Sequence, residues 1–307
     1  MRRIAVIDTG TNSTRLLVAD VEQRSVKELD RRTTITRLGE GVDRTGRLNR
    51  NAKERVRSCI SLYASILVEY EPLTTVILAT SSVRDAEDGA DFLAEIAQLY
   101  SYDHRILSGD EEARLSFSGA TFYTAQEHRT LLFDVGGGST EMVVGEGLDV
   151  AFTRSMRLGC VRLKERFLVS DPASNDEIRV ASGFIDGILA DAIDPAHVSG
   201  IDHGVGVAGT VTSLAAIDLG LKSYDRDLVH GHELTTGKVE ELFTRLAALP
   251  VEKRMQIPTM ERGRADVIVA GALIILRLLR YTGLQSFLVS ERDILDGAAL
   301  AVFEGKL

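Results

Sequence analysis

Two short segments of this 307-residue chain repeat one pattern of residue types that suits phosphate chemistry. "IDTGTNSTRLLV" covers residues 7–18, and "FDVGGGSTEMVV" covers residues 133–144. In each, an apolar run ends in an aspartate, and a glycine-containing turn with Ser and Thr hydroxyls follows. Such turns present backbone N–H groups that bind phosphate oxygens, while a carboxylate at the strand end suits a divalent cation. The repeat therefore predicts two phosphate-binding loops in one protein.

The two copies differ in charge at one position, where the first has Arg15 and the second has Glu141. We expect Arg15 to neutralise phosphate, because guanidinium groups suit oxyanions. We expect Glu141 and Asp134 to hold Mg²⁺ or the attacking water, with Asp8 as the second choice for the metal. The alternative is that Arg15 and Glu141 simply face solvent, as charged side chains usually do.

The elements around these loops predict an α/β protein with two related domains. Each loop joins two apolar runs, which is typical of a hairpin, and the first loop spans residues 9–13. Apolar residues at helical spacing predict a helix over 51–70 that ends before Pro72, and further helices near 161–167 and 177–192. We expect domains at 1–126 and 127–307, with a last helix near 294–304 that packs back on the first domain.

Composition narrows the class of protein. The formal net charge of −9 argues against a general nucleic-acid binder, which would present a basic face. The two cysteines, Cys59 and Cys160, lie too far apart for a disulfide framework or a zinc motif. The most apolar stretch, residues 267–279, is interrupted by Arg277 and is too short to span a bilayer. These features predict a cytoplasmic protein without a membrane or nucleic-acid partner.

The segments "DTGTNSTR" and "DVGGGSTE" resemble the two phosphate loops of the actin-like ATPase superfamily. More specifically, the chain resembles the exopolyphosphatase / guanosine pentaphosphate phosphatase (Ppx/GppA) family in its short two-domain form. The resemblance covers nearly the whole chain and rests also on "TRLGEGVDRTGRL" (36–48), "ATSSVRDA" (79–86), "SGDEEARLSFSG" (108–119), "LGCVRLKERF" (158–167), "GVAGTVTSLA" (206–215) and "VHGHELT" (229–235). One stretch departs from it: many members have "GLREG" where this chain has "DILDG" at 293–297, so a basic residue is missing there.

The resemblance implies an actin-like, ribonuclease H-like fold in which two related α/β domains surround a cleft. It implies Mg²⁺-dependent release of the terminal phosphate of inorganic polyphosphate by attack of water. A pppGpp phosphohydrolase, acting on guanosine penta- or tetraphosphate, is the alternative within the family. An actin-like kinase and a non-catalytic sensor of polyphosphate or nucleotides are the alternatives outside hydrolysis. A homodimer is suggested by the resemblance alone.

The segment "SGDEEA" contains the expected catalytic base. Ser108 and Glu111 have the spacing of a capping box, in which each side chain bonds the backbone N–H of the other residue. Adjacent helical residues do not share a face, so Glu112 is left for a different task. Glu112 also matches the glutamate that activates water in the family. The alternative is a solvated glutamate in a first helical turn.

The remaining expected site residues bind substrate. Arg84 would neutralise phosphate or instead pair with Asp85 or Glu87. The turn with Gly209 and Thr210 would contact a nucleotide or a distant phosphate, unless Thr210 simply caps a helix. With Glu112, Glu141 and Asp134 as the catalytic group, the substrate-binding set is Asp8, Gly10, Thr11, Asn12, Ser13, Arg15, Ser81, Arg84, Gly136, Gly137, Gly138, Ser139, Thr140, Gly209 and Thr210.

Overall fold

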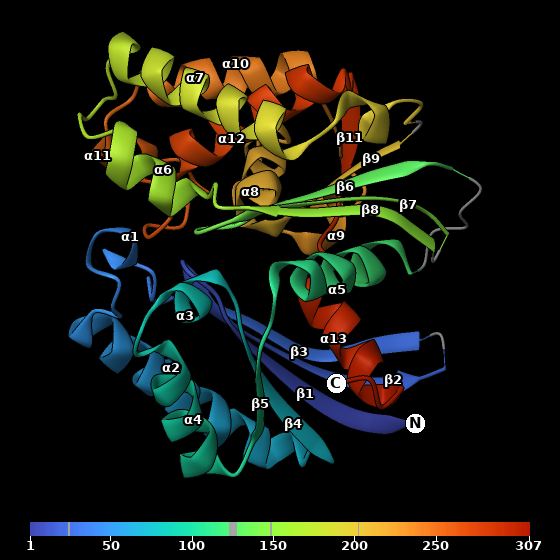
Figure 1. Ribbon diagram of the computed structural model, residues 1–307. Helices are drawn as coiled ribbons and strands as arrows, with labels where there is room; N and C mark the ends of the chain where they lie inside the picture. The colour runs from blue at the N-terminus through green and yellow to red at the C-terminus, as the bar shows by residue number, and fades with distance from the viewer. Residues whose placement is uncertain (24, 123–127, 148, 202) are drawn as a thin grey trace. The chain divides into compact units, whose positions relative to one another are not determined.

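The computed structural model describes residues 1–23, 25–122, 128–147, 149–201 and 203–307, and the chain forms two compact units (Figure 1). The first unit combines Met1–Phe122 with Arg292–Leu307, and the second is Tyr123–Glu291. The boundary expected between residues 126 and 127 falls outside the described residues. The last helix, α13 (Ile294–Phe303), therefore belongs to the first unit.

The first unit contains a five-stranded sheet in the order β3-β2-β1-β4-β5. Its strands are β1 (Arg2–Thr9), β2 (Ser13–Glu22), β3 (Ser25–Ile35), β4 (Thr74–Ala79) and β5 (Asp103–Ile106). β1, β2 and β3 run antiparallel, while β4 and β5 run parallel to β1. The hairpin β1–β2 agrees with the expected one, but β3 was not predicted. Its sequence, "SVKELDRRTTI", is dominated by charged residues and lacks a clear apolar alternation.

Alternate residues of β1 bury apolar side chains on opposite faces of this sheet. Ala5 and Ile7 pack in one core with α2 and α4, whereas Ile4 and Val6 pack in another core with α13. Figure 1 shows these helices on the two faces, with α5 beside α13. The helices of the unit are α1 (Val42–Thr45), α2 (Arg50–Tyr70), α3 (Ser81–Asp85), α4 (Gly89–Tyr100), α5 (Gly109–Thr121) and α13.

The second unit repeats this topology with one strand added. Its sheet has the order β10-β11-β9-β6-β7-β8, so β8-β7-β6-β9-β11 corresponds to the five strands of the first unit. β6, β7 and β8 are antiparallel neighbours, and β9 runs parallel to β6. The strands are β6 (Thr130–Val135), β7 (Thr140–Glu146), β8 (Asp149–Met156), β9 (His203–Val207), β10 (Glu233–Thr235) and β11 (Ser286–Val289). The shared topology confirms the expected actin-like, ribonuclease H-like class; a cleft between the units stays a prediction.

Helices pack on one face of the second sheet and share a single apolar core with Leu131, Phe133 and Met142. They include α12, the buried helix expected near 267–279. The bounds are α6 (Cys160–Phe167), α7 (Asn175–Ala192), the 3₁₀ helix η1 (Pro195–Val198), α8 (Ala208–Asp218), α9 (Arg226–Val229), α10 (Thr236–Ala247), α11 (Val251–Arg254) and α12 (Ile268–Thr282). Among the described residues, no helix combines the length and the apolar character needed to cross a membrane.

Candidate functional site

The two repeated segments form hairpin loops with the same local geometry. In the first, the N–H of Gly10 donates to the carbonyl of Ser13 over 2.9 Å; in the second, the N–H of Gly136 donates to the carbonyl of Ser139 over 3.0 Å. The register is also the same, because Asp8 lies opposite Arg15 and Asp134 lies opposite Glu141. The charge difference between the copies therefore gives an Asp–Arg cross-strand pair in the first hairpin and an Asp–Glu cross-strand pair in the second.

The first loop directs its carbonyl groups toward the chain that follows β3. Asn12 accepts hydrogen bonds from the N–H groups of Thr36 and Arg37, and Thr11 accepts one from Gly39 over 2.9 Å. Within the described residues, the N–H groups of Thr11 and Asn12 make no such bond, so they are the donors that this loop presents. The hydroxyl groups of Thr11 and Ser81 bond each other over 2.9 Å, which brings together two expected substrate-binding residues.

The second loop directs its carbonyl groups toward the N-terminus of α6. Cys160 and Val161 donate to the carbonyls of Gly136 and Gly137, each over 2.9 Å. The guanidinium of Arg162 donates to the carbonyl of Gly138 over 3.0 Å. In the described part of the chain, the N–H groups of Gly137, Gly138 and Ser139 have no such acceptor. Both loops thus have their carbonyls bound by protein while their N–H groups remain as donors, which is the arrangement that binds anions.

The second loop is flanked by two buried carboxylates. Asp134 and Glu141 are cross-strand partners that are 9% and 1% exposed. Glu141 accepts a hydrogen bond from the hydroxyl of Ser155 over 2.6 Å. Like charges directly opposite each other destabilise a sheet, so this pair is better suited to holding a cation than to strand pairing. The described residues contain no cluster of three or more His, Cys, Asp or Glu side chains placed for a metal. Mg²⁺ needs fewer, because it takes one or two carboxylates plus substrate phosphates.

In the first unit, the structure separates the roles of the two neighbouring glutamates as expected. Glu111 and Ser108 form the predicted capping box at the start of α5, and Glu111 also pairs with Arg105. Glu112 is 9% exposed and accepts from Arg84 Nη1 over 3.3 Å. Arg84 Nη1 also donates to the carbonyl of Leu107 over 2.6 Å. Arg84 therefore holds the side chain of the expected base in place. Neither of the two roles expected for Arg84 included Glu112 as its partner.

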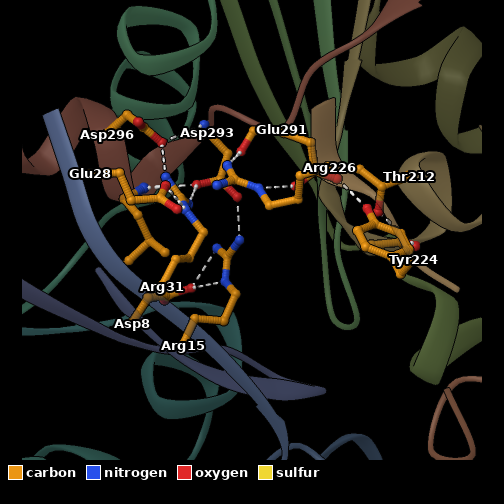
Figure 2. Close-up of polar contacts among 12 residues, drawn as sticks. Asp8, Arg15, Glu28, Arg31, Thr212, Tyr224, Arg226, Glu291, Asp293 and Asp296 are labelled. Carbon is orange, nitrogen blue, oxygen red and sulfur yellow. Dashed lines mark hydrogen bonds and ion pairs between the residues drawn. The ribbon is translucent and has the colours of Figure 1, made fainter. Parts of the chain in front are cut away.

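Arg15 lies in a buried network of ion pairs in the first unit (Figure 2). Its Nε and Nη2 donate to Asp8 Oδ2 over 3.1 and 2.7 Å, and its Nη1 bonds Asp293 Oδ2. Arg31 Nη2 bonds Asp296 Oδ2 over 2.6 Å. Burial raises the pKa of Asp8 above its usual value, although Arg15 acts to lower it. The guanidinium of Arg15 is thus engaged by two carboxylates, and its expected contact with phosphate stays a prediction.

The two carboxylate oxygens of Asp8 differ in their hydrogen bonding, because only Oδ2 bonds Arg15. Asp8 is 3% exposed, and its Oδ1 is buried without a hydrogen-bond partner among the described residues. A buried carboxylate oxygen without a partner is unfavourable. This orphaned atom fits a cation or a bound water, and therefore supports Asp8 of the first unit as a candidate metal ligand, in addition to the candidates Asp134 and Glu141 of the second unit.

The turn before α8 contains the two expected nucleotide-contacting residues. The helix begins at Ala208, so the alternative that Thr210 is its N-cap is wrong. Thr210 packs against Gly271 of α12, where an added Cβ would lie 2.4 Å from its hydroxyl oxygen. The guanidinium of Arg264 lies against Gly209, within 2.4 Å of an added Cβ. An anion is favoured beside a helix N-terminus without a side-chain cap, and the guanidinium of Arg264 there is already paired with Glu261 over 2.9 Å.

Several residues that shape these loops were not predicted from the sequence. Gly159 packs closely against the second loop and Arg162 donates to it. Asp293 bonds Arg15, and the buried hydroxyl of Ser82 has no partner within the described residues. Gly159 and Arg162 lie in the "LGCVRL" segment and Asp293 lies in the departure at 293–297, but the sequence did not indicate what these three residues contact. His232 bonds Asp218 over 2.9 Å. Arg226 pairs with Glu291 (Figure 2).

Comparison with known proteins agrees with this architecture. Exopolyphosphatase 2 of Mycobacterium tuberculosis is 36% identical over 316 aligned residues, covering 98% of this chain and 99% of that protein. The crystal structure of an exopolyphosphatase-like protein superposes with a TM-score of 0.92 at 32% identity, covering 99% of this chain and 100% of the other. A Ppx/GppA family member from Aquifex aeolicus superposes with a TM-score of 0.83 at 29% identity, covering 99% and 98%. A sequence model described as the Ppx/GppA phosphatase family matches residues 17–300. The chain belongs to the Ppx/GppA phosphatase family.

Proposed function

We propose that this protein is a Mg²⁺-dependent exopolyphosphatase that releases the terminal phosphate of inorganic polyphosphate by attack of water. The observation that carries the proposal is the pair of loops. Each loop has its carbonyls bound by protein, and beyond the bonded glycines Gly10 and Gly136 it has backbone N–H groups available, as a phosphate-binding loop requires. The name of the M. tuberculosis relative supports polyphosphate as the substrate. We place the enzyme in the cytoplasm without nucleic-acid or membrane partners, and the homodimer rests on the family resemblance.

In this mechanism Glu112 accepts the proton of the attacking water. The bonds from Arg84 to Glu112 and to the Leu107 carbonyl hold the carboxylate in one position. Phosphoryl transfer demands little covalent work from the protein, so orientation and charge neutralisation supply most of the rate enhancement. The loop N–H groups orient the phosphate chain and stabilise charge on its oxygens.

Asp134, Glu141 and Asp8 are the residues that would hold Mg²⁺. The like-charged pair in the second unit and the orphaned Oδ1 of Asp8 in the first are the features that fit it. When bound, Mg²⁺ supplies positive charge to phosphate oxygens.

A pppGpp phosphohydrolase is the second candidate. The observation that favours it is Arg264 beside Gly209 at the N-terminus of α8. This arrangement suits a second anionic group, as on a nucleotide that is phosphorylated at two positions. The catalytic residues would be the same for both substrates.

The test is phosphate release with Mg²⁺ from short polyphosphate, long polyphosphate and pppGpp in parallel. Glu112→Gln should lose about 10²–10⁴-fold in kcat while still binding substrate. The matched control is Glu111→Gln, which changes the adjacent carboxylate and removes its exposed ion pair with Arg105, while the glutamine oxygen can still accept from the N–H of Ser108. It should change stability and activity little.

Three results would change the assignment. Hydrolysis of pppGpp alone would move the substrate to the second candidate and keep the mechanism. Binding without any hydrolysis would make the protein a sensor. Equal activity in Glu112→Gln and wild type would remove the assignment of Glu112 as the base.

A further inference from the structure

Asp293 occupies a position in the first unit from which its two oxygen atoms perform different tasks. Oδ1 accepts from the N–H of Leu295 over 3.0 Å, which caps α13, and Oδ2 bonds Arg15 Nη1. The residue is 6% exposed. Burial alone would raise its pKa, but Arg15 and Arg31 hold the pKa of Asp293 below its usual range. A charged, buried carboxylate thus contacts the arginine that binds Asp8.

Arg15, the partner of Asp293, meets Asp8 through one oxygen only. Both Nε and Nη2 of Arg15 donate to the same oxygen, Asp8 Oδ2. An isolated Arg–carboxylate pair favours a bidentate arrangement, in which two N–H groups bond the two oxygens. Here the third nitrogen, Nη1, is directed at Asp293, and Oδ1 of Asp8 has no partner in the described part of the chain.

The charges around this group favour a cation. Asp8, Asp293 and Asp296 are all buried, and the described ion pairs bring them two guanidinium groups, those of Arg15 and Arg31. Arg31 also pairs with Glu28, so the described ion pairs bring four carboxylates to two guanidinium groups and leave an excess of negative charge. The orphaned oxygen of Asp8 is the place at which a cation would both find a ligand and balance this charge.

We propose that Asp293 is a positioning residue that holds Arg15 on one oxygen of Asp8 and thereby keeps Asp8 Oδ1 available to a divalent cation. The inference rests on the proposed function for its biological use, but cation binding can be measured without substrate. Residues that orient a metal ligand without touching the metal typically change metal affinity 10–100-fold when replaced.

The experiment measures Mn²⁺ binding to the full-length protein by electron paramagnetic resonance, without substrate. Asp8→Asn serves as the reference for loss of the ligand. Asp293→Asn and Asp293→Ser should each weaken Mn²⁺ binding about 10–100-fold at the site that Asp8→Asn removes. Both keep a side-chain oxygen that can cap α13, so helix capping is retained. Melting curves and circular dichroism establish that each variant is folded.

The matched control is Asp296→Asn. It removes the same charge from the same helix and the same network, but Asp296 bonds Arg31 rather than Arg15. Mn²⁺ affinity should change less than about 3-fold in this variant, because the loss of one nearby charge acts without altering Arg15.

Two outcomes overturn the inference. One is Mn²⁺ binding that stays unchanged, either in Asp8→Asn or in both folded Asp293 variants. The other is a loss of Mn²⁺ affinity in Asp296→Asn that equals the loss in the Asp293 variants. These outcomes are distinguishable from failure of the proposed function: a protein that hydrolyses no substrate, yet loses Mn²⁺ in the Asp293 variants, retains the positioning role. An active enzyme with unchanged Mn²⁺ binding in these variants retains the function and loses the inference.

Discussion

Gly159 should be intolerant of even the smallest side chain, because it lies against the second phosphate loop. A Cβ at this position would lie 2.3 Å from the carbonyl oxygen of Gly137 and 2.4 Å from the N of Gly138. Its φ of −137° is open to alanine, so the obstacle is the neighbouring loop and not the backbone conformation of Gly159. Gly159→Ala therefore displaces the loop from α6.

The size of the effect follows from these distances. Ordinary contacts begin near 3.4 Å, so the loop must move by about 1 Å. That movement breaks or lengthens the bonds from Cys160, Val161 and Arg162 to the loop carbonyls. The bonded loop carbonyls are three, those of Gly136, Gly137 and Gly138, and about 1 kcal/mol for each gives a loss of about 3 kcal/mol in the free energy of unfolding. A 1 Å misplacement of substrate-orienting groups lowers kcat/KM about 10²-fold.

The assay combines phosphate release from polyphosphate with thermal unfolding. A loss of about 3 kcal/mol corresponds to a decrease in Tm of roughly 6–12 °C for a unit of this size. Gly187→Ala is the control, since an added Cβ there meets nothing within 4 Å and should stabilise α7 by about 0.5–1 kcal/mol. Wild-type Tm and KM in Gly159→Ala would refute the view that α6 holds the loop in its phosphate-binding geometry. The Tm comparison is informative whatever substrate the enzyme prefers.

Three other substitutions test hydrogen bonds within the units. Arg254→Met should lower the free energy of unfolding by about 2–4 kcal/mol in urea titrations, because its buried guanidinium donates to two backbone carbonyls and a carboxylate. Tyr63→Phe should cost about 1 kcal/mol by the same measurement, through loss of the bond to the carbonyl of Thr14. Backbone N–H groups, first that of Ser174, hold the pKa of Glu177 at about 2, below the ordinary 4.5. A lowered carboxyl pKa stabilises the folded state above the unfolded pKa, and this contribution is lost as pH falls through the folded pKa. The Tm difference between wild type and Glu177→Gln should therefore be constant above about pH 5 and disappear near pH 2, and a difference that persists at pH 2 would contradict this origin.

Features that depend on neighbouring residues could be predicted from the sequence. The capping box of Ser108 and Glu111 and the two hairpin loops are set by contacts between residues close in the chain, so their spacing was sufficient. The buried helix α12 was evident from an apolar run too short for a membrane. Local rules failed at β3, because its charged residues belong to an antiparallel edge strand with one partner, β2.

Contacts between distant residues could not be predicted in the same way. Arg84 was expected to meet phosphate or an adjacent acid, but its partner Glu112 lies on a different helix. The pairing of Arg15 with Asp293 joins the first hairpin to the start of the last helix, and nothing in either segment specifies the other. The sequence showed that residues 293–297 depart from the family pattern by lacking a basic residue. Only the structure showed that Asp293 in this stretch pairs with Arg15.

The return of α13 to the first unit has a consequence for synthesis on the ribosome. The second unit is continuous in sequence, so all of its residues have been made before Arg292 is added. The first unit begins earlier but lacks the helix that covers Ile4, Val6 and Leu17 until residues 294–303 have emerged. Domains usually fold in the order in which they are translated. In this protein, one apolar face of the sheet in the nascent first unit stays uncovered by α13 while the second unit is made. During this interval that face is the surface to which a chaperone would bind.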